Sequence, residues 1–131
     1  MAILDALGAY LQTNSIGTLA TDMFLSRMPD TPDACVVLYE SAGVGPSQVF
    51  GASIHAVSHQ RIRVLCRAAR NDYPAARTKA TDVRAILGAI RATTLSGVVI
   101  HTVLATSDVY PVTRDQDDRP IIGCDYTVWM S

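Results

Sequence analysis

The sequence predicts an α+β fold in which a mixed, mostly antiparallel β-sheet carries two helices packed on one face. Two segments space their apolar side chains as helices do, and several others have the length and alternation of strands. No strand–helix–strand order repeats along the chain, which disfavours a doubly wound parallel sheet. With 131 residues, 49% of them hydrophobic, the chain suits a single domain over residues 1–131 with its own core.

The first third of the chain predicts one helix and two strands. The N-terminal segment has apolar side chains at helical spacing: Ile3, Leu7, Tyr10 and Leu11. Asn14 and Gly17 then supply a stop signal. Residues 22–28 predict a short strand, and the apolar run 34–40 predicts a central strand. The glycine-rich stretch 41–56 is then a long flexible connection or an extended hairpin arm, and in a ring-forming subunit it would be a candidate for a neighbour or lumen contact.

Residues 58–68 alternate as a strand that has two different faces. The side chains expected in the core are Ile62, Val64 and Cys66. The side chains expected on the opposite face are Arg61, Arg63, Leu65 and Arg67. One face of this strand is therefore apolar, and the other is mostly cationic.

The second helix is predicted over residues 72–92. Asn71 or Asp72 can cap it, and Pro74 lies in the first turn, where a missing N–H has no cost. Gly97 follows its end. The expected buried stripe consists of Ala76, Ala80, Val83, Ile86, Leu87 and Ile90.

The remaining segments predict strands around a polar turn. Residues 98–105 form one strand, short pairing is expected near 110–112, and residues 120–130 form the last strand. One face of the last strand carries Ile122, Cys124, Tyr126, Val128 and Met130. Its other face carries Asp125, Thr127 and Trp129.

Charge and cysteine content narrow the class of protein. A net charge of -1 and a pI near 6.2 argue against a general nucleic-acid binder, although a local basic stripe remains open. The three cysteines are odd in number and separated in sequence, as expected of free thiols in a reducing cytosol. The N-terminus has no basic leader, and no segment has the ~20 apolar residues of a membrane span. We therefore expect a soluble protein made in the cytoplasm.

The residue types that carry chemistry do not form a recognisable motif. The histidines, His55, His59 and His101, lack metal-ligand spacing on a helix, and no GxSxG elbow is present. The glycines of 43–47 lack the lysine of a phosphate-binding loop. The acidic cluster lacks the glycine and distal glutamate of a calcium loop and is better interpreted as a charged turn: Asp115, Asp117 and Asp118. We therefore expect no catalytic residue, cofactor or metal, and no enzyme.

The cationic strand face has two interpretations. Arg61, Arg63 and Arg67 could be the solvated outside of an edge strand, charged to discourage aggregation. Alternatively, they form a partner surface or a lumen stripe past which DNA moves. Arg114 and Arg119 can pair with the aspartates of the charged turn, although exposed pairs contribute only about 0–1 kcal/mol each.

Three stretches, taken in order, carry a resemblance that covers nearly the whole chain. In MPDTPDACVVLYESAGVGP, a proline precedes an apolar strand and a Gly/Pro loop. In HQRIRVLCRAARNDYPAARTKATDVRAIL, a strand with arginines precedes a short turn and an amphipathic helix. In VYPVTRDQDDRPIIGCDYTVWM, a proline-containing strand, an acidic turn with arginine and an alternating closing strand follow one another. This layout resembles the bacteriophage minor capsid and tail-terminator-like family.

The resemblance implies a structural virion protein at the head–tail junction of a long-tailed phage. Such a subunit would assemble with itself, commonly as a hexameric ring, on the end of the tail tube. It would stop tube growth and offer a surface to the head connector or stopper protein, with non-specific DNA contact in the lumen as a further possibility. A head-completion or stopper role is the alternative within this setting, and the family has no catalytic residues to carry over.

Ring closure is expected to pair a sheet edge or loop of one subunit with the next. The 41–56 stretch and the 106–120 turn are the candidate adaptable contacts. Trp129 and Tyr126 are candidate anchors, with core packing as the alternative for Trp129. The full set of candidate interface or lumen residues is Arg61, Arg63, Arg67, Asp115, Asp117, Asp118, Arg119 and Trp129. The rivals from other classes are a small-molecule-binding or enzymatic α+β domain and a dimeric adaptor or antitoxin-like protein.

Overall fold

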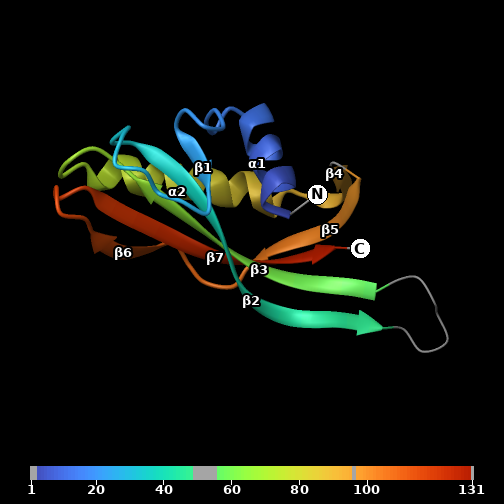
Figure 1. Cartoon of the computed structure of the whole chain (residues 1–131). Coiled ribbons are helices and arrows are strands. Elements are labelled where there is room, and N and C mark those ends of the chain that lie inside the picture. Colours follow the sequence, from blue (N-terminus) through green and yellow to red (C-terminus); the bar gives the residue numbers. More distant parts are fainter. Residues whose placement is uncertain (1–2, 49–55, 96, 131) are drawn as a thin grey trace.

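The computed structural model describes residues 3–48, 56–95 and 97–130, which contain two helices and one curled sheet (Figure 1). The strands follow the order β1-β2-β3-β7-β5-β4, and β6 also pairs with β7. The elements are α1 (Ile3–Thr13), β1 (Met23–Leu25), β2 (Cys35–Gln48), β3 (Ala56–Arg67), α2 (Tyr73–Gly88), β4 (Arg91–Leu95), β5 (Val98–Ala105), β6 (Tyr110–Arg114) and β7 (Pro120–Met130).

The sheet is mixed but mostly antiparallel, as the sequence predicts. Only β1 and β2 run parallel, and every other pairing between the named strands is antiparallel. β3 and β7 lie at the centre and pair continuously from Ser58 opposite Met130 to Arg67 opposite Ile121. The β5 and β6 strands pair in succession along the other side of β7.

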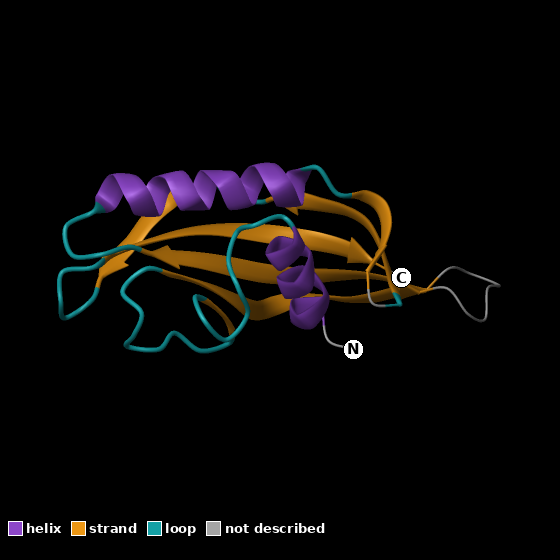
Figure 2. Ribbon diagram, turned by 90° about the horizontal axis from the view of Figure 1, so that it is seen from above, coloured by secondary structure: helices purple, strands orange, loops and turns teal. Residues whose placement is uncertain are grey.

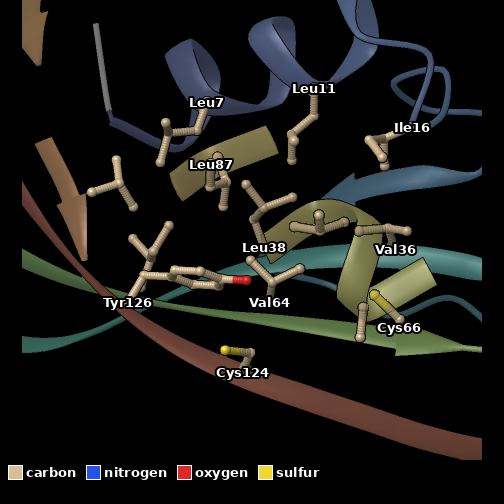
Figure 3. Packing of buried hydrophobic residues seen from close by; sticks show 14 of the residues in the cluster. Leu7, Leu11, Ile16, Val36, Leu38, Val64, Cys66, Leu87, Cys124 and Tyr126 are labelled. Carbon is tan, nitrogen blue, oxygen red and sulfur yellow. The ribbon is translucent and has the colours of Figure 1, made fainter. Parts of the chain in front are cut away.

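Both helices pack on the same face of the sheet, which confirms the predicted layering (Figure 2). The apolar stripe of α2 is buried at Ala76, Ala80, Val83 and Leu87. Figure 3 shows side chains from both helices meeting those of β2, β3 and β7: Leu7, Leu11, Leu87, Leu38, Val64 and Tyr126. Each buried leucine or isoleucine contributes about 1.5–3 kcal/mol, so this interface supplies most of the driving force for folding.

The second helix begins as predicted but ends earlier. Asp72 is its N-cap, with the carboxylate accepting from the Ala75 N–H at 3.4 Å. The helix stops at Gly88, so the prediction that it continues to residue 92 is wrong. The next residues form β4 instead, because Ala92 has a left-handed φ of 45° and the following threonines favour a strand.

The β2 strand is longer than predicted, and the β1 strand is shorter. Of the two alternatives for residues 41–56, the extended hairpin arm is confirmed as far as Gln48 and from Ala56 onward, while residues 49–55, including His55, lie outside the described residues. Two register shifts against β3 accommodate the glycines of this arm. β1 pairs with β2 over only three residues, so β2 is near an edge of the sheet and not central.

The core contains a tyrosine, Tyr126, whose hydroxyl group lacks a hydrogen bond to the described residues. The Tyr126 side chain is fully buried. The neighbouring Cys124 thiol donates instead to the Ser107 carbonyl at 3.5 Å, so it offers at best a weak acceptor. Burial, with the Cys124 sulfur beside it, raises the pKa of Tyr126 and keeps it neutral.

We expect Tyr126→Phe to leave the free energy of unfolding unchanged or to raise it by up to about 1 kcal/mol, because no hydrogen bond is lost and a polar atom leaves the core. Urea denaturation followed by circular dichroism measures this. Tyr126→Leu is the control and should cost about 2 kcal/mol or more through the cavity it leaves. A loss above about 1 kcal/mol in the phenylalanine variant would show that the hydroxyl has a partner.

Candidate assembly surface

The sheet has a second face, turned away from the helices, which we call the outer face. Residues directly opposite one another on paired strands share a face, so the β3–β7 register places Arg61 with Thr127, Arg63 with Asp125 and His59 with Trp129. The uncovered part of the outer face carries Tyr39, His59, Arg61, Arg63, Leu65, Leu104, Tyr110, Val112, Asp125, Thr127 and Trp129.

The two exposed arginines of the outer face differ in their contacts. Arg63 Nε donates to Asp125 Oδ1 at 2.7 Å, and this hydrogen bond raises the pKa of Arg63. The pair neutralises itself, and because it is exposed it adds little stability. The side chain of Arg61, two residues earlier, makes no ion pair or hydrogen bond with any part of the chain that the structure describes. Arg61 is therefore the cation of this face that is available to a partner.

Large apolar side chains are unusually exposed on the outer face. Trp129 is 37% exposed, Leu104 48% and Val112 39%. The Trp129 indole stacks on His59, with ring centroids 3.8 Å apart and planes tilted by 34°. The prediction that Trp129 anchors a contact therefore remains open, whereas core packing of Trp129 is wrong. Tyr126 is in the core instead, so it cannot be an exposed anchor.

A glycine in β7 leaves room for two apolar side chains on the outer face. A Cβ at Gly123 would lie 2.8 Å from Val112 Cγ2 and 2.9 Å from Leu65 Cδ2. Those two side chains therefore close over the glycine, and any larger residue would push them apart.

Arg67 is not part of the exposed cationic surface, contrary to the prediction. It is only 5% exposed, and its guanidinium donates to main-chain carbonyls of the loop before β2. The acceptors are Pro29 O at 2.7 Å, Asp30 O at 3.2 Å, Pro32 O at 2.8 Å and Asp33 O at 2.9 Å. Arg67 therefore holds this loop over one end of the outer face, where Val37 is fully buried.

Arg119 holds the same loop from the β6–β7 turn and is also 5% exposed. It forms ion pairs with Asp115 at 2.6 Å, Asp30 at 2.9 Å, Asp33 at 3.1 Å and Asp117 at 3.4 Å. The predicted pairing of Arg119 with the turn aspartates is confirmed, but its exposure is not. Arg114 donates to the Asn71 side chain instead, at 2.9 Å. We call Arg67 and Arg119 together the arginine clamp.

Two of the three aspartates of the β6–β7 turn, Asp115 and Asp117, form ion pairs with Arg119 of the arginine clamp. Burial would raise the pKa of Asp115, but hydrogen bonds from the backbone N–H groups of Arg119 and Asp117 and from the Arg119 guanidinium outweigh it and lower the pKa. Asp118 lies 3.7 Å from Arg70 in an exposed pair. Of the acidic candidates, Asp117 and Asp118 remain on the surface, and Asp115 acts within the fold.

The described residues contain no group of three histidine, cysteine, aspartate or glutamate side chains that could hold a metal ion. All three cysteines are buried, and burial raises the pKa of the Cys66 thiol to about 12, which disfavours a thiolate. Within the same residues, no helix combines the length and apolar character needed to cross a bilayer.

The clamp predicts a specific dependence of stability on pH. Because the pKa of Asp115 is lower in the folded chain than the ordinary carboxyl value of about 3.9, its charge stabilises the fold at neutral pH, and this contribution is lost as the pH falls below that value. Asp115→Asn should lower the free energy of unfolding at pH 7 and flatten its decline between about pH 5 and pH 2. Urea titrations across this range measure both effects.

The matched control is Asp118→Asn, which removes an exposed and longer ion pair and should leave the pH profile close to that of the original chain. Equal pH profiles for Asp115→Asn and the unmodified protein would contradict a structural role for the Asp115 carboxylate.

Comparison with solved structures finds the same fold in a virus-like particle. A chain of the virion of the native gene transfer agent particle aligns with a TM-score of 0.69 and 13% identity, covering 98% of this chain and 94% of its own. A second solved chain aligns with a TM-score of 0.48 and 15% identity, over 97% and 90% of the two chains, and adds nothing to the argument. No curated protein sequence matches the chain.

The model of the family described as "Bacteriophage tail terminator protein" matches residues 10–129. This span contains β3, β7 up to Trp129, α2, the arginine clamp and the outer-face residues named above. The resemblance seen in the order of the sequence motifs is thereby confirmed, and the chain belongs to the bacteriophage tail terminator protein family.

Proposed function

We propose that this protein forms a ring, as a single domain repeated around the tail axis, that caps the tail tube of a phage-like particle and joins it to the head connector. Family membership supports the setting in the virion. The observation that best supports assembly is that three large apolar side chains are exposed on an open face of the sheet: Trp129, Leu104 and Val112. An uncovered sheet face is normally polar, and an exposed group of large apolar side chains marks a contact surface.

Contacts through this face are better supported than contacts through the sheet edges. Beyond Leu38, no described strand pairs with the free edge of β2, but this part of β2 is irregular: its pairing with β3 has two register shifts, and it contains Pro46, which has no N–H. At the other edge, the Thr93 hydroxyl donates to the Arg91 carbonyl at 2.9 Å and Ala92 breaks the regular backbone. Bulges and proline are devices that discourage strand addition. The edge pairing expected from the sequence therefore has less support than the outer face.

The two ends of the sheet offer separate axial contacts. The β2–β3 hairpin and the β6–β7 turn lie at opposite ends of the molecule (Figure 1). The turn is stiffened by the arginine clamp and still exposes Asp117 and Asp118. We assign one end to the tube protein and the other to the connector, so that both surfaces of the ring are used.

The alternatives find less support. Among the described residues of the outer face, a DNA-lining role would have one exposed arginine without an ion pair, Arg61, because Arg63 is neutralised by Asp125. A small-molecule site would bring polar groups together in an enclosed pocket. The hollow between the clamp and the β6–β7 turn is instead lined by side chains that already pair with one another, among them Arg119 and Asp117. A stopper role within the same particle is the remaining competitor and is separated from a terminator by experiment.

Purified protein added to tail tubes that lack their terminator should bind one tube end as a ring and prevent further tube growth. Electron microscopy of the tubes and a tube-length assay measure this. A ring that binds the isolated head connector but leaves tube length uncontrolled would reject the terminator role in favour of a stopper. A monomer that binds neither would reject both roles.

The outer face gives a second prediction. Leu104→Ser combined with Trp129→Ala should remain folded, with unfolding free energy within about 1 kcal/mol of the original, because both side chains are already partly exposed. Capping of tail tubes should fall at least about tenfold, because exposed aromatic and apolar side chains dominate contact energies. Asp5→Ser, an exposed change on α1, is the control. Undiminished capping by the double variant would remove the outer face from the assembly.

A further inference from the structure

The exposed large apolar side chains divide between two opposite surfaces. In the part of the chain that the structure describes, four such side chains are more than one third exposed. Leu104, Val112 and Trp129 lie on the outer face of the sheet. The fourth, Tyr73, is 39% exposed at the start of α2, on the helix side of the molecule.

Tyr73 lines a shallow hollow on the side of α2 that is turned away from the sheet. The hollow has a volume of about 400 Å³, and we call it the α2 hollow. Arg77 Nη1 donates to the Tyr73 hydroxyl at 3.2 Å and to the Val109 carbonyl at 3.4 Å, which fixes one wall. Its lining residues are Tyr73, Pro74, Arg77, Thr78, Thr81 and Asp82.

Each surface carries a charged side chain of opposite sign that forms no ion pair within the described residues. Arg61 lies on β3 in the row that continues through Thr127 to Leu104, with Trp129 diagonal to it. The Asp82 side chain lies in the α2 hollow and, like that of Arg61, makes no ion pair or hydrogen bond with another described residue. Arg77, the cation of the hollow, donates to neutral oxygens of Tyr73 and Val109, so Asp82 is the anion that an incoming arginine would meet there. Nearby charges are already paired, as in Arg63–Asp125 at 2.7 Å and Arg84–Asp108 at 2.6 Å.

We propose that the docking patch formed by Arg61, Leu104 and Trp129 of one copy seats in the α2 hollow of a second copy, with Arg61 paired to Asp82. The apolar side chains of the patch would cover the rings of Tyr73 and Pro74, and the two unpaired charges would meet beside them. Because the hollow is shallow and open, the indole would lie against its surface beside Tyr73.

This contact joins different surfaces of the two copies, because α2 covers the inner face of the sheet and the docking patch lies on the outer face. A head-to-tail contact of this kind leaves a free patch at one end and a free hollow at the other, so it propagates from copy to copy and gives a ring when the rotation between neighbours closes. The inference rests on the proposed ring function and names the surfaces that build the ring.

The test exchanges the two charges between chains. Arg61→Glu alone and Asp82→Arg alone should each weaken ring formation at least about tenfold, because like charges meet at every contact. An equal mixture of the two variants should restore rings, since the introduced glutamate of one variant faces the introduced arginine of the other, and the unchanged Arg61 of the second variant faces the unchanged Asp82 of the first. Native mass spectrometry of the mixture should then show alternating rings with an even number of subunits.

Both positions are exposed, so circular dichroism and thermal unfolding should be unchanged, and Arg27→Glu provides a matched charge reversal away from both surfaces. Rings of normal yield from either single variant, or a mixture that stays unassembled, would overturn the contact while leaving the proposed function intact. Failure of the unmodified protein to form rings, alone or on tail tubes, would instead overturn the proposed function.

Discussion

Ten consecutive residue pairs join β3 to β7, and this register decides the character of both faces of the sheet. It aligns Ile62, Val64 and Cys66 with Tyr126, Cys124 and Ile122 under the helices. The alternate positions align Arg63 with Asp125 and His59 with Trp129 on the outer face. A slip of one residue would move every apolar side chain of one strand to the opposite side, so burial by the helices fixes the outer face as firmly as it fixes the core.

Most of the fold follows from periodicity in the sequence. The alternation over residues 58–68 and 120–130 predicted the central strands and both of their faces, because a half-buried strand needs that pattern. Asp72 and Pro74 predicted the start of α2 for equally local reasons. The end of that helix was missed because Ile90 continues the apolar stripe although it is no longer helical, and the change of backbone at Ala92 leaves little trace in residue type.

The candidate site was predicted less completely. Arg61, Arg63 and Trp129 lie on the outer face, as strand alternation requires, but the same alternation could not distinguish Arg67 from them. Arg67 differs because a loop more than thirty residues earlier folds over it, and contacts between a guanidinium and main-chain carbonyls depend on the path of the chain. The exposure of Leu104 and the hollow on α2 also arise only from tertiary packing.

Arg67 holds the loop before β2 through four backbone oxygens and through none of its side chains. Arg119 adds ion pairs to the Asp30 and Asp33 side chains of the same loop. The course of the segment is consequently insensitive to the side chains at its other positions, provided that the backbone can follow the same path. Those positions can acquire new side chains, and so suit a different neighbour, without disturbing the scaffold beneath them.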